Sequence, residues 1–254
     1  MTKPTVNLCV IATDKYLGFL LPMLSSARRY FCADFAPTFH VWTDTTLVLD
    51  GLIAPRKRQD SPDSKIVTHP VVHEPWPGVT LHRFRTFLSA ADSLMKNDFT
   101  FYADVDGLFV RPVGEEILSG LVAVRHPGYA GRPLTLLPLE TNRQSTAYVP
   151  PKLRKQYCAG GFQGGRTDRW LQACREMDDR IRIDEKNGVM ARSHDESHWN
   201  CYLAHHQELR SDCRNGAPLL LSQDYCAHEG APYSDQNTAR YISLKKNNAE
   251  FHAP

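Results

Sequence analysis

The sequence predicts an α/β protein built around a largely parallel β-sheet. Short apolar runs typical of buried strands alternate along the chain with longer stretches of helical periodicity. The composition over 254 residues, 42% hydrophobic and 23% charged, is that of a globular chain able to bury a sizeable core. No segment reaches the roughly 18 apolar residues of a membrane span. Since no repeat or linker divides the chain, we expect a single unit.

The first half of the chain is expected to alternate strands with helices. Residues 5–12 predict a buried strand, and residues 16–30 a helix that Pro22 should kink. Strands are expected at 37–44 and 65–72. Apolar side chains at helical spacing then predict one helix over 80–97, with Leu81, Phe84, Leu88, Ala91 and Met95 on its buried face.

The second half begins with the aromatic strand that starts at Phe99. We expect a short helix near Glu115 and a strand at 121–127 to follow it. Residues 128–166 are rich in Gly, Pro, Thr and Arg, which predicts a functional loop region. A helix over 167–186 should end at Asn187-Gly188, and another should begin near Asp195.

Charge and cysteine content narrow the class of protein. A net charge of +2 without a basic stripe gives no indication of a nucleic-acid partner. The apolar run near the N-terminus is too short for a signal peptide. The seven cysteines are an odd number and show no CxxC spacing, which favours reduced thiols over a disulfide framework. These features favour a cytoplasmic protein.

Two aspartates lie at the tip of the aromatic strand. Asp104 and Asp106 are separated by one residue, and side chains two positions apart in an extended segment face the same side. Ligands of open α/β sheets bind beyond the carboxyl ends of the strands. Paired carboxylates suit Mg²⁺ or Mn²⁺, which complete their coordination with water and phosphate oxygens. The motif therefore indicates a clamp for a metal and a diphosphate, as a nucleotide-sugar enzyme needs.

Two other interpretations of this segment remain open. A hydrophobic strand followed by DVDG also matches the first motif of haloacid-dehalogenase phosphatases, with Asp104 as nucleophile and Asp106 as general acid. That motif normally lies near the N-terminus and continues with Thr or Val, whereas here it lies well inside the chain and Leu108 follows. The third interpretation is a simple turn after a strand.

A second cluster of polar residues is HDESH, which contains His194, Asp195, Glu196 and His198. Two histidines four residues apart on a helix suggest zinc, but the metalloprotease pattern HExxH has Glu where this chain has Asp195, and no third ligand is apparent. The dipole of a helix N-terminus accounts for the acidic residues but not for the histidines. Alternatively, Glu196 faces a sugar, because a carboxylate can stabilise or attack the positive charge that develops at an anomeric carbon.

Taken together, these clusters and the segments between them resemble glycosyltransferase family 6, which includes the histo-blood-group A and B transferases and α-1,3-galactosyltransferase. HDESH and GGFQGG, following a DxD motif at this spacing, are specific only in combination. The resemblance places the phosphatase and turn interpretations below a transferase. The matching segments span nearly the whole chain: ATDKY (12–16), the helix with Val79 and Arg83, YADVDGLF (102–109), RHPGY (125–129), QSTAYVP (144–150), YCAGGFQGG (157–165), DEKNG (184–188), HDESHWNCYL (194–203) and RYISLKKN (240–247).

The resemblance implies a GT-A fold and a retaining transfer reaction. Residues up to about 112 would form the UDP-sugar-binding half of one domain, and the rest the acceptor-binding and catalytic half. GalNAc or Gal would pass from UDP-GalNAc or UDP-Gal to the 3-OH of a galactoside oligosaccharide, fucosylated or not, forming an α-1,3 bond. The implied cofactor is Mn²⁺, with Mg²⁺ as the alternative. A non-catalytic galactoside-binding protein is the remaining alternative.

The resemblance also assigns roles to residues on the donor side. The uridine would be held by Ile11, Ala12 and Tyr16, with Tyr16 stacked on the uracil. Val79 and Arg83 would line the donor site. Asp104 and Asp106, on either side of Val105, would bind Mn²⁺ and the ribose–diphosphate. Lys246 would reach the diphosphate as the C-terminal tail closes.

On the sugar side, the resemblance implies that Asp195 hydrogen-bonds the donor sugar and that Glu196 is the nucleophile or charge stabiliser. His126 would contact the acceptor galactose, with Ser193 and Glu196 nearby. Donor choice in the family depends on the segment read here as Ala159-Gly160-Gly161, whose small residues leave room for an N-acetyl group and so favour GalNAc.

Two residues depart from the family pattern. Ser193 stands where blood-group members have a tryptophan, and Asn248 replaces a histidine of the tail. Bacterial members often have NxN in place of DxD and work without metal, whereas this chain keeps both carboxylates, so we expect metal dependence. The membrane anchor and stem of the Golgi members are not found in the sequence, which favours a bacterial or phage-like cytoplasmic enzyme.

Overall fold

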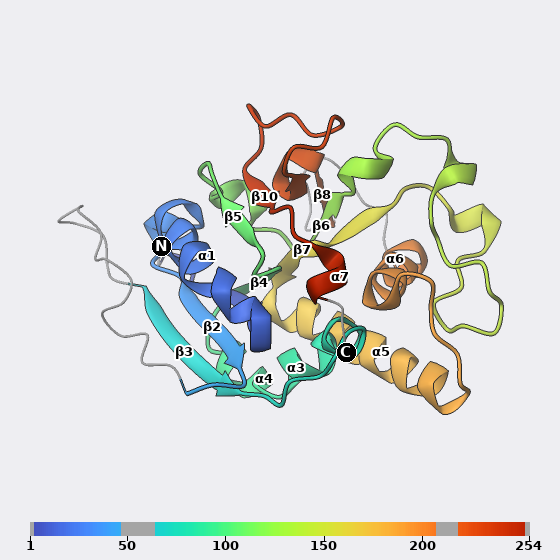
Figure 1. The fold of residues 1–254 in the computed structure, drawn as a ribbon, viewed down its shortest axis with the longest axis horizontal. Helices are drawn as coiled ribbons and strands as arrows, with labels where there is room; N and C mark the ends of the chain where they lie inside the picture. Colours follow the sequence, from blue (N-terminus) through green and yellow to red (C-terminus); the bar gives the residue numbers. More distant parts are fainter. Residues whose placement is uncertain (1–2, 47–63, 207–217, 252–254) are drawn as a thin grey trace.

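The computed structural model describes residues 3–46, 64–206 and 218–251 and has a seven-stranded sheet in the order β3-β2-β1-β4-β7-β6-β8 (Figure 1). The first four strands of this order are mutually parallel, β7 is antiparallel to both of its neighbours, and β8 is parallel to β6. The expectation of an α/β fold with a parallel-dominated sheet is confirmed. The strands are β1 Val6–Ile11, β2 Thr38–Thr43, β3 Lys65–Pro70, β4 Phe99–Ala103, β6 Leu121–Arg125, β7 Cys158–Arg166 and β8 Leu219–Leu221.

Helices cover both faces of this sheet. The α-helices are α1 Leu17–Tyr30, α2 Gly78–Leu81, α3 Arg83–Leu88, α4 Ala91–Leu94, α5 Thr167–Lys186, α6 His194–His206 and α7 Asn248–Phe251. Short 3₁₀ turns include Asp14–Tyr16, Glu115–Ile117 and Pro127–Tyr129. The predicted helices 16–30 and 167–186 and the short helix near Glu115, which is 3₁₀, are therefore confirmed, and α6 begins beside Asp195 as expected. Pro22 lies inside α1.

The alternation of side chains along β1 explains why both faces need cover. Val6, Leu8 and Val10 pack in one cluster with the buried face of α1, whereas Cys9 packs in a second cluster with Trp170 of α5 and the aromatic residues of α3. A parallel sheet that is apolar on both faces is stable only when helices exclude water from each. Figure 1 shows α1 and α5 on different sides of the central strands.

The predicted helix over 80–97 is wrong as a single element. The segment forms α2, α3 and α4, with breaks at His82 (φ −94°, ψ 10°) and Ala90 (φ −119°, ψ 24°). Its buried apolar positions are 81, 84, 87, 90 and 94, which mostly follow a three-residue step instead of the 3.6-residue period of one long helix. Met95, expected on the buried face, is 53% exposed.

The expectation of a loop throughout 128–166 is also wrong, because its last nine residues form β7 in the middle of the sheet. Because glycine weakens a strand interior, the glycines of this segment led to the prediction of a loop. In the sheet they are required by close packing: a Cβ on Gly164 would overlap Phe101 and the carbonyl of Thr100, and one on Gly165 (φ +142°) would lie 2.7 Å from the carbonyl oxygen of Gly120. The remainder, between β6 and β7, packs against α6 in a third apolar cluster.

A small second sheet, which the sequence did not predict, brings the C-terminal segment back to the main sheet. Its order is β5-β10-β9, formed by Gly107–Phe109, Tyr241–Ser243 and Ala227–His228. The chain then continues into α7, where Phe251 packs on Tyr16 with ring centroids 5.1 Å apart. Figure 1 shows α7 in front of the central strands. The C-terminal tail therefore packs on the segment that joins β1 to α1.

Two sequence expectations concern membranes and thiols. Within the three described ranges, no helix combines the length and the apolar character needed to cross a bilayer. The six cysteines of these ranges are buried and unpaired, and the seventh, Cys213, lies outside the described residues.

Candidate active site

The two aspartates of the DxD motif occupy a tight turn between β4 and β5. The turn interpretation is correct for the backbone, since β4 ends at Ala103 and β5 begins at Gly107. The main-chain N–H of Asp104 donates to the carbonyl of Gly161 at 2.9 Å, which extends the β4–β7 ladder to the first carboxylate. Both aspartates line two separate pockets, so the turn also presents its carboxylates to open space.

The two pockets meet at Asp104, Asp106 and Lys246. The first, which we call the β1 pocket, encloses about 210 Å³ and is lined by Ile11, Thr13, Tyr16, Trp76, Val79, Thr80, Arg83, Tyr102, Asp104, Val105, Asp106 and Lys246. The second, the β10 pocket, encloses about 520 Å³ and is lined by Asp104, Asp106, His228, Glu229, Gly230, Ala231, Tyr233, Ser243, Leu244, Lys245, Lys246 and Asn248. Carboxylates therefore form the boundary between two candidate ligand spaces.

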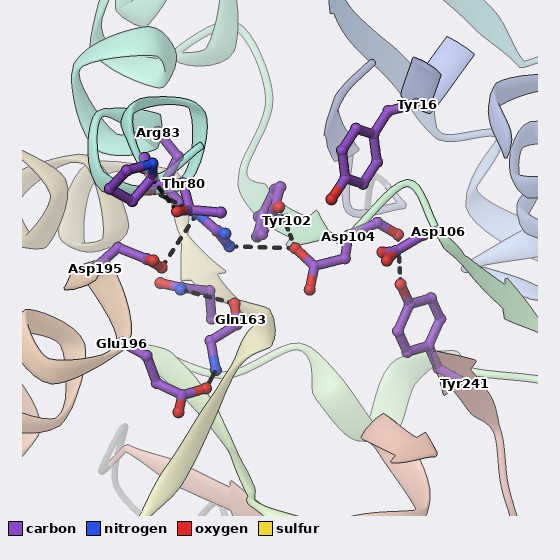
Figure 2. A network of polar contacts seen from close by, with 12 residues as sticks. Tyr16, Thr80, Arg83, Tyr102, Asp104, Asp106, Gln163, Asp195, Glu196 and Tyr241 are labelled. Carbon is purple, nitrogen blue, oxygen red and sulfur yellow. Dashed lines mark hydrogen bonds and ion pairs between the residues drawn. The ribbon is translucent and has the colours of Figure 1, made fainter. Parts of the chain in front are cut away.

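Arg83 joins the DxD motif to α6. Its Nη1 lies 3.2 Å from Asp104 Oδ1 and its Nε lies 3.1 Å from Asp195 Oδ2, and Figure 2 shows the guanidinium between the two carboxylates. Burial alone lowers the pKa of Arg83, but Asp195, Tyr102 and Asp104 together raise it above its usual value. A buried cation that bridges two carboxylates fixes residues distant in the sequence at one point.

Lys246 plays the corresponding part for Asp106. Its ammonium pairs with Asp106 Oδ2, donates to the hydroxyl of Tyr16 at 2.9 Å and lies 4.5 Å from the centre of the Tyr16 ring. Burial and the neighbouring charge of Asp104 raise the pKa of Asp106, while Lys246 opposes that rise. Through Lys246, the C-terminal tail thus contacts both Asp106 and Tyr16 in the β1 pocket.

The two carboxylates also fit a divalent cation. Both are oxygen donors of the kind that Mn²⁺ and Mg²⁺ prefer. Burial and then repulsion from Asp104 raise the pKa of Asp106, and a cation between the two carboxylates would relieve that repulsion. Arg83 and Tyr102 both bind Asp104 through Oδ1, so Oδ2 remains outside these two bonds.

The first turn of α6 carries the second carboxylate pair. Glu196 Oε2 accepts a hydrogen bond from the main-chain N–H of Gly160 at 2.7 Å. Burial raises the pKa of Asp195 to about 7 even though Arg83 lowers it, and burial also raises the pKa of Glu196. The hydroxyl of Tyr157 lies close enough to Glu196 to lower the pKa of that carboxyl.

His126 belongs to an aromatic cluster next to Glu196. Its ring centroid lies 4.9 Å from that of Tyr129, 5.6 Å from that of Tyr157 and 5.5 Å from that of His228. Burial lowers the pKa of His126 to about 4, so the imidazole is neutral. Because Tyr157 is beside Glu196 and His228 lines the β10 pocket, the cluster connects the α6 pair with that pocket.

The histidines of HDESH do not form a common site. His198 is buried, with its Nε2 3.8 Å from Asp184 Oδ2, whereas the ring of His194 packs edge-on against Trp76. Among the described residues, no group of three His, Cys, Asp or Glu side chains is placed to hold a metal ion. The structure therefore does not support the zinc interpretation, because the two histidines contact different residues.

Comparison with known proteins identifies the family. The family model described as Glycosyltransferase family 6 matches residues 1–251. The chain belongs to glycosyltransferase family 6. It is similar to the O-antigen biosynthesis glycosyltransferase WbnI of Escherichia coli, with 28% identity over 255 residues and 97% of both chains covered.

Two vertebrate relatives are also similar. Human globoside alpha-1,3-N-acetylgalactosaminyltransferase 1 is 30% identical over 199 residues, covering 77% of this chain and 56% of the relative. Rat histo-blood group ABO system transferase 1 is 28% identical over 255 residues, covering 97% of this chain and 68% of the relative. Family membership makes the chain a glycosyltransferase with a nucleotide-sugar donor and a glycan acceptor, and replaces the phosphatase interpretation of DVDG.

Most residues assigned from the family resemblance meet around the two pockets. Ile11, Tyr16, Val79, Val105 and Lys246 line the β1 pocket together with Arg83 and both aspartates. Gly160 and Gly161 lie between the carboxylate pairs: a Cβ on Gly160 would lie 3.4 Å from Asp195 and Glu196, and one on Gly161 would lie 2.6 Å from Asp104 Oδ2. Asn248 lines the β10 pocket.

Three of the residues assigned from the family resemblance do not line either of the two pockets. Ala12 and Ala159 have their methyl groups in the apolar core packed against α1, and neither lines a pocket described above. Ser193 is half-buried just before α6, where its N–H donates to the Ser197 hydroxyl at 2.9 Å.

Sequence reasoning missed several residues at the site. Tyr102 donates its hydroxyl hydrogen bond to Asp104 Oδ1, and Tyr241 donates to the main-chain carbonyl of Asp104. Trp76 and Thr13 line the β1 pocket. A signal existed only for Tyr102, because it precedes Asp104 by two positions on a strand and so shares its face.

Proposed function

We propose that the protein is a retaining transferase that moves GalNAc or Gal from a UDP-sugar to the 3-OH of a galactoside acceptor, forming an α-1,3 bond. The observation that carries the proposal is the Arg83 bridge, which holds Asp104 of DxD and Asp195 of HDESH at one point. The donor would be held largely by residues up to about 112, and the acceptor by those that follow. The name of the human relative describes alpha-1,3-N-acetylgalactosaminyl transfer, which supports this donor and linkage.

Asp104 and Asp106 would hold Mn²⁺, with Mg²⁺ as the alternative. Such an ion, when bound, neutralises charge on a diphosphate leaving group. The chain supplies two further cations at the same place, Arg83 and Lys246, both of which line the β1 pocket. Their fixed positive charge stabilises a departing UDP without any rearrangement of solvent.

Tyr16 and the C-terminal tail would bind the uridine. The Tyr16 ring lines the β1 pocket and is braced by Phe19 and Phe251 at centroid distances of 6.2 and 5.1 Å. An aromatic ring held in this way offers a flat face for a base to stack on. Lys15 Nζ donates to the Glu250 carbonyl at 2.9 Å and so joins the tail to the same segment.

Glu196 would face the positive charge that develops at the anomeric carbon. It must be ionised for this role, yet burial raises its pKa. The Gly160 N–H, the nearby Tyr157 hydroxyl and Arg83 counter that rise. Asp195, fixed by Arg83, would accept a hydrogen bond from a donor-sugar hydroxyl, and His126 would contact the acceptor across the aromatic cluster.

Incubation of the protein with UDP-GalNAc or UDP-Gal and a lactose acceptor, with and without fucose, tests this proposal. Each reaction is run in Mn²⁺ and in EDTA, and products are identified by mass spectrometry and by the anomeric coupling in NMR. We expect one added hexose or N-acetylhexosamine in α linkage, formed in Mn²⁺ only. Galactoside binding without consumption of UDP-sugar would instead support a binding protein.

A further inference from the structure

We propose that Tyr102 is a positioning residue that orients the metal-binding carboxylate of Asp104. The inference rests on the proposed function, because it assumes that Asp104 and Asp106 hold a divalent cation. It adds a residue that neither the DxD motif nor the family resemblance assigns. Tyr102 lies on β4 two positions before Asp104, so the two side chains emerge from the same face of the strand.

Tyr102 is itself held in one position. The residue is 4% exposed, its ring centroid lies 5.0 Å from that of Phe87, and the Arg83 guanidinium lies 4.8 Å from the centre of its ring. A phenol hydroxyl fixed in this way donates in one direction, and here it donates to Asp104 Oδ1. Arg83 Nη1 binds the same oxygen at 3.2 Å, and Figure 2 shows both contacts converging on it.

The remaining polar atoms of Asp104 are also fixed, with one exception. Its main-chain N–H donates to the Gly161 carbonyl, and its carbonyl accepts from the Tyr241 hydroxyl. Oδ2 lies outside all of these bonds. It points toward Gly161, where even a single added Cβ would lie only 2.6 Å away. The missing side chain of Gly161 thus keeps space around the oxygen that Tyr102 and Arg83 do not use.

This arrangement leaves Asp104 one oxygen, Oδ2, with which to bind a metal ion. A carboxylate with Oδ1 held by two donors cannot turn about its side-chain torsion without breaking both bonds, so Oδ2 keeps one direction. Partners that orient a metal ligand typically contribute about 10- to 100-fold in metal affinity. Asp106 differs, because its partner is Lys246 of the C-terminal tail. Of the two ligands, Asp104 is therefore fixed by the sheet and Asp106 by the tail.

The chain contains a matched arrangement away from DxD. Tyr225 donates to Glu116 Oε1 at 3.1 Å, and Arg240 lies 5.3 Å from the centre of the Tyr225 ring and 3.7 Å from Glu116. None of these three residues lines either pocket. Tyr225→Phe therefore removes the same kind of hydroxyl from the same kind of Tyr–Arg–carboxylate group, and serves as the control for Tyr102→Phe.

The test is Mn²⁺ binding in the presence of UDP, measured for wild type, Tyr102→Phe and Tyr225→Phe by the loss of the free Mn²⁺ signal in EPR. Phe keeps the ring under Arg83 and removes only the hydroxyl. We expect Tyr102→Phe to raise the Kd for Mn²⁺ by about tenfold and Tyr225→Phe to leave it unchanged. In turnover assays, the Mn²⁺ concentration at half-maximal rate should rise while kcat at saturating Mn²⁺ changes much less. Thermal unfolding checks that each variant folds, and Tyr102→Leu is the second variant, expected to raise the Kd at least as far.

The outcomes separate the inference from the function on which it rests. Equal Mn²⁺ affinity of wild type and Tyr102→Phe, both folded, would overturn the role of Tyr102 and leave the proposed function standing. A Tyr225→Phe effect as large as that of Tyr102→Phe would also overturn it, because the loss would then be structural. If wild type binds no Mn²⁺, or binds it equally well after Asp104→Asn, the metal site of the proposed function fails and this inference fails with it.

Discussion

The two carboxylate pairs of the site carry the same formal charge in different surroundings. Asp104 pairs with Arg83 of α3 and Asp106 pairs with Lys246 of the tail, and both aspartates line the two pockets. Asp195 and Glu196 adjoin each other in the first turn of α6, and the cation beside them is Arg83, which they share with Asp104. The two pairs therefore compete for one guanidinium.

This difference indicates a division of labour. Carboxylates that face open pockets from a tight turn are suited to gather a cation and a diphosphate. Buried carboxylates with little compensating charge have raised pKa values, that of Asp195 reaching about 7, and are poised to interact with charge or hydroxyls arriving from a sugar. Arg83 contacts one carboxylate of each pair, Asp104 and Asp195. The following experiments test that division, from the largest expected effect to the smallest.

Removing the DxD charges should have the largest effect. Asp104→Asn combined with Asp106→Asn leaves Lys246 without its carboxylate, leaves Arg83 paired with Asp195 alone, and removes both carboxylate charges from the cation site. We expect Mn²⁺-stimulated turnover to be abolished, measured as UDP release across a Mn²⁺ titration. Asp168→Asn, at an exposed aspartate that pairs with Arg166, is the matched control. Full activity of the wild type in EDTA would contradict the metal clamp.

Removing the charge of Glu196 should come next. Glu196→Gln keeps the size of the side chain and loses the anion that faces the anomeric carbon. We expect transfer to fall at least about a hundredfold, or a few kcal/mol of barrier, with Mn²⁺ affinity unchanged because the DxD pair is intact. Glu115→Gln, at an exposed position, is the control. A Gln variant with near wild-type rates would remove Glu196 from the reaction.

The pH dependence of activity should report Asp195. A carboxyl with a pKa of about 7 loses its proton as the pH rises, and only the ionised form pairs fully with Arg83 and accepts a sugar hydroxyl. We therefore expect kcat/KM to rise with pH up to about 7 and then level, falling about tenfold per unit on the acid side. Asp195→Asn should be slower and lack this limb. An acid limb that persists unchanged in Asp195→Asn would assign it to another group.

Substitutions at Gly160 and Gly161 of β7 should have the smallest effects, each on a different carboxylate pair. A methyl on Gly161 presses on Asp104, and one on Gly160 faces Asp195 and Glu196. We expect Gly161→Ala to shift donor preference several-fold from UDP-GalNAc toward UDP-Gal and to raise the Mn²⁺ requirement. Gly160→Ala should lower the rate at an unchanged Mn²⁺ requirement. A donor ratio that Gly161→Ala leaves unaltered would reject the pocket-size argument.

Sequence patterns predicted the parts of this molecule in which local periodicity and tertiary structure agree. The apolar strand that ends in DxD, the helix that ends at Asn187-Gly188 and the acidic start of α6 all follow from short-range rules. β7 did not, because four glycines in nine residues indicate a loop unless the neighbouring Phe101 and Gly120 are known to leave no room for a Cβ. The 80–97 segment breaks at His82 and Ala90 without a proline or glycine at either position, so local rules could not predict the breaks.

The candidate site, like the fold, could be predicted from local sequence patterns only in part. DxD and HDESH were visible as motifs, but the residue that unites them, Arg83, is an ordinary helical arginine until the fold places it between Asp104 and Asp195. Its assignment came from the family resemblance. The Tyr241 hydroxyl on the Asp104 carbonyl likewise depends on a small second sheet that no periodicity predicted. Contacts between segments far apart in the sequence carry this information, and a local pattern does not contain them.

The most direct test of the account is the anomalous diffraction of manganese in crystals of the protein with Mn²⁺ and UDP. We expect a single strong peak between the side chains of Asp104 and Asp106, next to the diphosphate, with the uracil on Tyr16 in the β1 pocket. A uridine bound elsewhere, or a manganese peak remote from both aspartates, would contradict it.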